Sequence, residues 1–221
     1  MTQYQPQGFK MLPTAVKHLL IINVLLYGIH YVLGMQGINL YSLATKTLGM
    51  PFPQGYFVTL NDILGLWSLD THGFCFWQPF TYMFMHGSLT HLFMNMFMLW
   101  MFGNTIENFW GTRRFVIYYL LCGLGAGLIT MFIPEAHTVG ASAAVYGLLL
   151  AFGMTFPNEY VYLYFLMPIK AKWMITGMVV LELIEGIFFT YDGIAHFAHL
   201  GGMLVGLLLI LWWRKHPFSR L

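Results

Sequence analysis

The chain has 221 residues, of which 58% are hydrophobic and only 8% are charged, and its formal net charge is +2. Soluble domains carry about 25% charged residues, so water could not solvate a surface this poor in charge, and we expect lipid to surround the protein. The small net charge argues against nucleic acid as a partner. The only cysteines, Cys75 and Cys122, exclude a disulfide framework and a Cys-x-x-Cys metal site.

The length fits a single domain that begins after a short polar segment. We expect residues 1–13 to form a cytoplasmic N-terminal segment, because residues 1–10 are polar and lack a cleavable signal pattern. We expect residues 14–213 to form the membrane domain, which would make the protein an integral, multi-pass membrane protein.

Six apolar segments predict an all-α membrane protein built as a six-transmembrane-helix bundle. A spanning helix needs about 20 mostly apolar residues. The fourth segment is short, and it can cross only if one end lies inside protein or in a water-filled cavity. Between the first two segments, residues 34–78 contain prolines and several aromatic side chains, which predicts an interfacial outer loop resting on the bilayer. The expected spans are 14–33, 83–103, 113–133, 142–156, 173–190 and 196–213.

The basic residues predict how this bundle is oriented. With the N-terminus in the cytoplasm, the outer loops contain only Lys46, and all other basic residues fall inside, as positively charged inner loops require. Both termini are therefore expected in the cytoplasm, with residues 214–221 as a basic tail. The inner basic residues are Lys10, Lys17, Arg113, Arg114, Lys170, Lys172, Arg214, Lys215 and Arg220.

Polar side chains gather at the outer ends of the second, fourth and sixth predicted helices. Polar residues within spans are costly, so each is a candidate functional residue. A hydroxyl, imidazoles and a carboxamide at a similar depth predict a catalytic constellation. These residues are His86, His91 and Asn95 on the second helix, Ser142 on the fourth, and His196 and His199 on the sixth.

Ser142 stands at the start of the fourth helix. A serine in that place is most often a helix cap. The same place offers unpaired backbone N–H groups and the positive end of the helix dipole, which suit a tetrahedral oxyanion. Tyr146 follows one turn later on the same helix face.

His199 is followed by Gly202 and Gly206, a spacing of small residues that lets another helix approach closely. We expect the partner to be the small-residue stretch 140–144, which would bring the imidazole to the Ser142 hydroxyl. A serine needs such a base to become nucleophilic. The alternative is a buried histidine bonded to a backbone carbonyl, and the presence of the serine favours catalysis.

Three other features leave alternatives open. His91 and Asn95 share a helix face, so they either line an oxyanion pocket or join two helices. The histidines do not form a His-Glu-x-x-His stretch, and we expect no metal and no cofactor. Glu182 and Glu185 lie in the fifth predicted helix. Three interpretations stay open for these glutamates: they are protonated, they pair with polar groups inside the bundle, or they line an ion path. The last of these makes a transporter or channel an alternative function.

Most of residues 75–206 resemble the rhomboid family of intramembrane proteases. The motifs follow the family's order, but Gln78 stands where the family has arginine, and Ala143 stands where it has glycine after the serine. The matching segments are Phe76 to Thr81, the His-x-x-x-Asn motif at His91 and Asn95, Gly103 to Phe115, Gly140 to Ser142, and Ala198-His199 with Gly202 and Gly206.

The resemblance implies an endopeptidase with Ser142 as nucleophile and His199 as general base, without a third carboxylate. It implies an oxyanion site of His91, Asn95 and the Ser142 backbone N–H, with Tyr146 stacked on His199. It also implies transmembrane protein substrates, cut near their outer ends, and we expect a bacterial inner membrane as the location. The main alternative is a catalytically inactive rhomboid-like protein that binds transmembrane clients.

Overall fold

The computed structural model describes residues 10–134, 137–163, 166–188 and 195–216. Parts of several predicted segments lie outside these residues: positions 1–9 of the N-terminal segment, 189–190 of the fifth span and 217–221 of the tail, including Arg220. The described part is mostly helical. Its elements are α1 (Thr14–Met35), η1 (Leu43–Thr47), α2 (Leu60–Leu64), β1 (Leu66–Trp67), α3 (Gln78–Thr81), η2 (Tyr82–Phe84), α4 (Leu89–Met98), η3 (Leu99–Gly103), α5 (Asn104–Trp110), α6 (Thr112–Thr130), β2 (His137–Thr138), α7 (Ser142–Thr155), β3 (Tyr160–Leu163), β4 (Met167–Lys170), α8 (Ala171–Phe188) and α9 (His196–Lys215).

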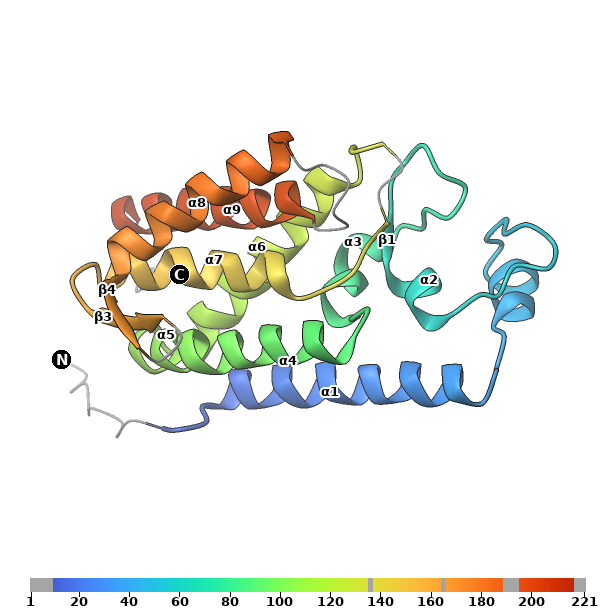
Figure 1. The fold of residues 1–221 in the computed structure, drawn as a ribbon, viewed down its shortest axis with the longest axis horizontal. Helices are drawn as coiled ribbons and strands as arrows, with labels where there is room; N and C mark the ends of the chain where they lie inside the picture. The colour runs from blue at the N-terminus through green and yellow to red at the C-terminus, as the bar shows by residue number, and fades with distance from the viewer. Residues whose placement is uncertain (1–9, 135–136, 164–165, 189–194, 217–221) are drawn as a thin grey trace.

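Helix α7 is the centre of the bundle. It contacts α4, α6, α8 and α9, and Figure 1 shows it between α4 on one side and the pair α8 and α9 on the other. Most of its residues are buried, and alanine and glycine recur along it, so neighbouring helices can approach its backbone closely. Helix α1 packs outside this group, against α4 and α6.

The second predicted span starts later than expected. Residues Tyr82–Phe84 form a separate 3-10 turn, and the α-helix begins at Leu89. Ser88 caps it, because its hydroxyl accepts a hydrogen bond from the His91 backbone N–H at 3.1 Å. His86 therefore precedes the helix, contrary to the prediction. Hydropathy could not reveal this break, because the turn before it is as apolar as the helix.

Two short antiparallel sheets depart from the all-α prediction. Strands β3 and β4 form a hairpin that joins α7 to α8. Strands β1 and β2 pair Leu66 with Thr138 and Trp67 with His137. The pairing of β1 with β2 joins the long connection after α1 to the segment that leads into α7.

The connection between α1 and α4 forms a lobe at one end of the bundle and has structure of its own (Figure 1). A small apolar cluster around Met50 and Val58 fills its interior. Gln78 is fully buried in it and makes four hydrogen bonds with main-chain groups. Its Oε1 accepts from the N–H groups of Trp67 and Cys75, at 3.2 and 3.0 Å, and its Nε2 donates to the carbonyls of Ile63 and Gly73, at 3.3 and 2.9 Å.

Glu107 fastens α1 to the rest of the bundle. Its side chain is buried in α5, and its two carboxylate oxygens accept from the backbone N–H groups of Ala15 and Val16, at 2.9 and 2.8 Å. The Thr112 hydroxyl donates to the same carboxylate at 2.7 Å. Because α1 has no capping side chain of its own, Glu107 caps its first turn from another helix.

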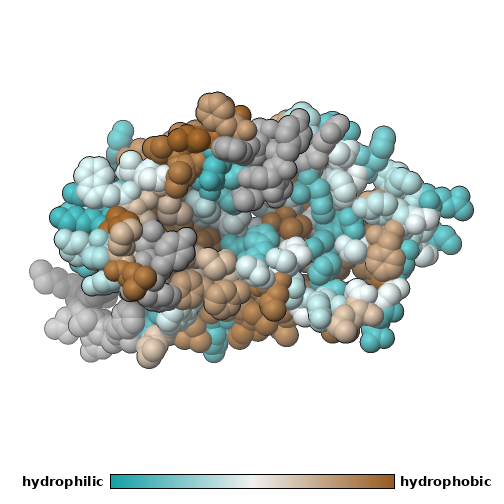
Figure 2. Space-filling view, viewed as in Figure 1, coloured by the Kyte–Doolittle hydropathy of each residue, from teal (hydrophilic) through white to brown (hydrophobic). Residues whose placement is uncertain are grey.

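The outer surface is apolar where the long helices face outward. Exposed side chains of this kind include Ile21 and Leu25 on α1 and Leu181 and Ile184 on α8. Figure 2 shows hydrophobic side chains gathered along the upper and lower sides of the molecule, between its ends, and hydrophilic ones at both ends, including the end formed by the lobe. Among the described helices, α1, α6 and α9 are long and apolar enough to cross a membrane, and α7 is a shorter apolar helix.

Candidate active site

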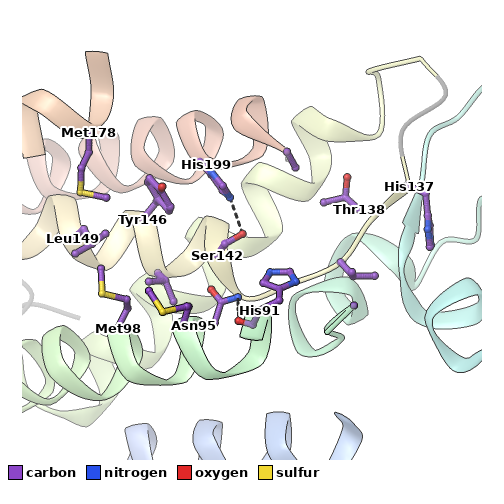
Figure 3. A pocket seen from close by; sticks show the side chains of 15 residues that line it. His91, Asn95, Met98, His137, Thr138, Ser142, Tyr146, Leu149, Met178 and His199 are labelled. Carbon is purple, nitrogen blue, oxygen red and sulfur yellow. Dashed lines mark hydrogen bonds between the residues drawn. The ribbon is translucent and has the colours of Figure 1, made fainter. Parts of the chain in front are cut away.

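Ser142 and His199 meet in the interior of the bundle although 57 residues separate them in the chain. The Ser142 Oγ lies 2.9 Å from the His199 Nε2, within hydrogen-bonding distance (Figure 3). The helix cap is Ala141 rather than Ser142. The serine is thus the first residue of α7, and its hydroxyl points to the imidazole instead of closing its own helix.

Close helix packing creates this contact. A Cβ added to Gly202 would collide with the Ala143 carbonyl oxygen, so α9 touches the α7 backbone there and tolerates no side chain. Gly206 has a different partner from the one expected. A Cβ there would meet the Tyr118 hydroxyl and Cys122 Sγ, so this glycine accommodates α6. The two glycines therefore seat α9 against two different helices.

His91 reaches the site from α4 because of Gly140. The glycine has φ +128°, a left-handed conformation that disfavours other residues, and a Cβ there would lie 2.7 Å from the His91 Nε2. The imidazole thus lies over the turn that leads into Ser142 (Figure 3). His86 packs edge-on against it, with ring centroids 5.1 Å apart, but does not line the pocket described below.

Asn95 is buried one helical turn after His91, and its side chain also lines the pocket. Its Nδ2 donates to the His91 carbonyl at 3.1 Å. A carboxamide has a second N–H, which remains available in addition to this bond. The cap residue Ala141 makes no side-chain hydrogen bond to the first backbone N–H groups of α7. The imidazole, the carboxamide and these N–H groups therefore form a set of donors around Ser142.

A cavity of about 500 Å³ contains this set of side chains. Its walls come from α4, α7, α8 and α9, from β2 and from the segment that follows β2, and they combine polar groups with apolar side chains (Figure 3). It is large enough for several residues of a peptide chain. The lining residues are Gly87, His91, Met94, Asn95, Met98, His137, Thr138, Val139, Ser142, Val145, Tyr146, Leu149, Met178, Ala195 and His199.

Tyr146 stacks on His199, with ring centroids 4.2 Å apart and an angle of 5° between the planes. Tyr146 comes one turn after Ser142 on α7, so the two residues that contact His199 from this helix lie on the same helix face. The stacking restricts rotation of the imidazole ring.

A carboxylate contacts the other nitrogen of His199, where the resemblance implied none. The Glu182 Oε1 lies 3.0 Å from the His199 Nδ1, and its Oε2 lies 2.8 Å from the His196 Nδ1. All three side chains are buried. From the sequence, pairing inside the bundle was one of several readings of Glu182, and no spacing indicated which histidines it would meet.

The same three residues are the group, among the described residues, that could hold a metal ion. One ligand atom from each of Glu182, His196 and His199 lies within 4.8 Å of the others. In the structure, hydrogen bonds between the carboxylate and the two imidazoles already join these atoms. His199 is also occupied on its other nitrogen by Ser142.

Comparison with protein families identifies a match over most of the chain. A family model described as the Rhomboid domain matches residues 74–216, the region that contains α3 to α9 and all the residues that line the cavity, but not α1 or the part of the lobe before residue 74.

Several curated proteins are similar to the chain. The Rhomboid-like protease 3 of Toxoplasma gondii is 30% identical over 145 residues, which cover 64% of this chain and 53% of that protein. The Rhomboid protease GlpG of Photorhabdus laumondii is 27% identical over 157 residues, which cover 69% and 53%. The Rhomboid-like protein 11, chloroplastic, of Arabidopsis thaliana is 32% identical over 170 residues, which cover 66% and 56%.

The chain thus spans about half the length of these relatives. Other similar proteins include the RHOMBOID-like protein 6, mitochondrial, of Arabidopsis thaliana. Because proteins named for mitochondria and chloroplasts stand beside a bacterial one, the comparison does not support the expectation of a bacterial inner membrane.

Proposed function

The chain belongs to the rhomboid family, and from this premise we propose that it is an intramembrane serine endopeptidase that cleaves transmembrane segments of other proteins. One observation carries the proposal. The Ser142 hydroxyl lies 2.9 Å from the His199 Nε2, at the start of a helix and inside a cavity with further hydrogen-bond donors. A serine hydroxyl is a weak nucleophile unless a base accepts its proton, and the imidazole stands where that base must be.

The protein is an integral membrane protein, and we propose six crossings: α1, the continuous helix from α4 to α5, α6, α7, α8 and α9. Lys10 is hydrogen bonded to Asn108, and Trp110 packs on Trp213, so the first described residues and the end of α9 both lie beside α5. An even number of crossings fits this arrangement, with both termini on the cytoplasmic side.

The shortness of α7 supports a reaction site below the membrane surface. Its 14 residues are about 21 Å long, which is less than the roughly 30 Å of a bilayer's hydrocarbon core. With the last residues of α7 at the inner surface, Ser142, its first residue, lies below the outer surface of the membrane. The cavity around it supplies room for a segment of substrate and for the water that hydrolysis requires.

The reaction follows from these positions. The Ser142 Oγ attacks the scissile carbonyl carbon while its proton passes to the His199 Nε2. The tetrahedral intermediate carries an oxyanion, which His91, Asn95 and the Ser142 backbone N–H would stabilise by hydrogen bonds. The C–N bond then breaks, and the leaving amine takes the proton from His199. Water adds to the acyl-enzyme, again with His199 as base, and releases the new carboxyl end and Ser142.

Unwinding of the substrate is part of this proposal. The carbonyl groups of a transmembrane helix are hydrogen bonded within the helix, so a scissile carbonyl is not accessible until the local turn opens. Substrates with helix-destabilising residues near the cut are therefore expected to be preferred, and the resemblance to the family implies small residues at the cut.

The test combines a probe with a substrate. The purified protein is treated with a fluorophosphonate, and the labelled residue is identified by peptide mass spectrometry. In parallel, a panel of single-span proteins is assayed for cleavage. We expect label on Ser142 and cleavage of at least one substrate. Both activities should fall by several orders of magnitude in Ser142→Ala and His199→Ala variants that unfold at the same temperature as the parent.

The inactive alternative makes the opposite prediction. A rhomboid-like protein that only binds transmembrane clients would leave Ser142 unlabelled and every substrate intact, while a client would still be retained on the immobilised protein. That combination of results would overturn the proposed activity.

A further inference from the structure

The carboxylate of Glu182 is the feature of the site that the proposed mechanism does not use. It is buried in the middle of α8, and it contacts His199 on the nitrogen that faces away from Ser142. Serine, imidazole and carboxylate thus form one continuous chain of hydrogen bonds across three helices, α7, α9 and α8.

This chain decides which nitrogen of His199 carries the proton. An ionised carboxylate only accepts hydrogen bonds, so a bond at 3.0 Å requires a hydrogen on the His199 Nδ1. In a neutral imidazole, the Nε2 then has a free lone pair. That lone pair faces the Ser142 Oγ and is able to accept its proton. The opposite tautomer would present an N–H to the serine and could not act as a base.

His196 keeps the carboxylate in place. Its Nδ1 lies 2.8 Å from the Oε2 of Glu182, so each oxygen of the carboxylate has its own imidazole partner. Two donors on two oxygens hold the carboxylate in one orientation and stabilise its charged form. The Tyr146 ring closes a third side of His199 by stacking.

From this geometry, and resting on the proposed protease function, we propose that Glu182 is a positioning residue that completes a Ser142–His199–Glu182 triad. It holds His199 in the tautomer that has Nε2 free, and its negative charge stabilises the imidazolium formed when Ser142 gives up its proton. Glu182 itself gains no proton during the cycle. A third carboxylate of this kind contributes mainly in the transition state, when the imidazole is charged.

The neighbouring carboxylate provides a matched control. Glu185 is on the same helix, three residues later, but its side chain is 44% exposed and its nearest oxygen is 3.7 Å from the His196 Nδ1. A purely structural role, in which Glu182 only joins α8 to α9, would be served by any side chain that preserves the fold. The two hypotheses therefore differ in kcat rather than in stability.

The experiment compares Glu182→Gln, Glu182→Asp and Glu185→Gln with the parent in one detergent. The rate of fluorophosphonate labelling, kcat and KM for one transmembrane substrate, and the unfolding temperature are measured for each. Glutamine keeps the shape of glutamate but removes its charge, and one of its two ends presents N–H groups to an imidazole. We expect Glu182→Gln to lower kcat and the labelling rate about a hundredfold or more, with little change in KM or unfolding temperature. Glu182→Asp should recover part of the loss, and Glu185→Gln should behave as the parent does.

Two results would overturn the triad while leaving the protease function intact. One is a Glu182→Gln variant that matches Glu185→Gln in kcat. The other is equal loss in Glu182→Gln and Glu182→Asp in proportion to a lowered unfolding temperature, which would mean that Glu182 only holds helices together. A parent protein that neither labels at Ser142 nor cleaves any substrate would instead overturn the proposed function, and the triad with it.

Discussion

At the scale of single residues, the site depends on which partner each polar group finds. The Ser142 hydroxyl contacts the His199 imidazole instead of capping its own helix, and Asn95 donates one N–H to the carbonyl of His91. Gln78 satisfies four main-chain groups at once. The partner of Ser142 comes from the tertiary arrangement, whereas Asn95 bonds a carbonyl of its own helix and Gln78 combines near and distant partners. Asn95 and Gln78 lead to specific predictions.

Replacing Asn95 with alanine should lower kcat more than it raises KM. A donor that binds the oxyanion acts only when charge develops, and loss of one such donor typically costs about 2.7–4 kcal/mol of transition-state stabilisation. His91 and the Ser142 N–H remain, so we expect the lower end of this range. Steady-state kinetics on one transmembrane substrate would measure it. Met98→Ala, in the same cavity wall, is the control for lost packing, and a raised KM at unchanged kcat in Asn95→Ala would assign Asn95 to substrate binding.

Replacing Gln78 with arginine should destabilise the protein, although arginine is the residue that the family has there. Arginine has no acceptor, so the partly buried N–H groups of Trp67 and Cys75 would lose their partner, and a charge would stand where Gln78 is fully buried. A buried polar group left unsatisfied costs about 1–3 kcal/mol. Thermal unfolding in detergent would measure the change, with Gln54→Arg on the exposed part of the lobe as control. A Gln78→Arg variant that is more stable than the parent would contradict this explanation.

At the scale of elements, the chemistry depends on how closely α7 and α9 approach each other. Ala143 is buried between Ala126 of α6 and Ala198 of α9, and its backbone lies against Gly202. These contacts explain why a small residue is needed directly after the serine. They also show that alanine fits in place of the family's glycine, because its methyl group has its own apolar surroundings.

Substitutions at Ala143 should therefore separate packing from chemistry. Ala143→Gly should stay active with equal or slightly lower stability, since glycine is about 1 kcal/mol less favourable in a helix. Ala143→Leu should push α9 away from α7 and move His199 from Ser142. A displacement of about 1 Å costs on the order of a hundredfold in rate. Cleavage assays on both variants in one detergent would test this, and a fully active leucine variant would mean that the packing does not control the distance between the two residues.

At the scale of the whole molecule, the connections between helices decide how the bundle is closed. Glu107 caps α1 from α5, and the pairing of β1 with β2 fastens the lobe to the entrance of α7. The lobe therefore has a fixed position beside the cavity, rather than hanging from the bundle as a linker. The first described residues and the end of α9 lie on the opposite side from it (Figure 1).

Six crossings predict a definite labelling pattern in sealed vesicles. In a variant without Cys75 and Cys122, single cysteines at the exposed positions Lys10 and Lys215 should react alike with a membrane-impermeant maleimide, and a cysteine at the exposed Lys46 should react from the other side. Labelling before and after the vesicles are opened with detergent would measure this. Different sidedness of positions 10 and 215 would require an odd number of crossings.

The amino-acid sequence by itself determined the helical, lipid-facing character of the protein and the family to which it belongs. A low content of charged residues and long apolar segments indicate that lipid surrounds the protein. They can be identified without knowing which residues are in contact. Helices occur at all six predicted segments. The second helix was predicted to begin at Met83 but begins at Leu89, because hydropathy does not detect the Ser88 cap within an apolar stretch.

Only the tertiary structure decided which polar groups meet. The 2.9 Å between Ser142 and His199, the partner of Gly206 and the place of Glu182 between two histidines depend on how four helices are rotated about their axes. Helical periodicity defines which residues share one face, but not which neighbouring helix that face meets. Which helices face each other depends on packing over the whole bundle. This packing brings the Glu182 carboxylate to the His199 Nδ1, a contact that the spacing of residues in the sequence did not indicate.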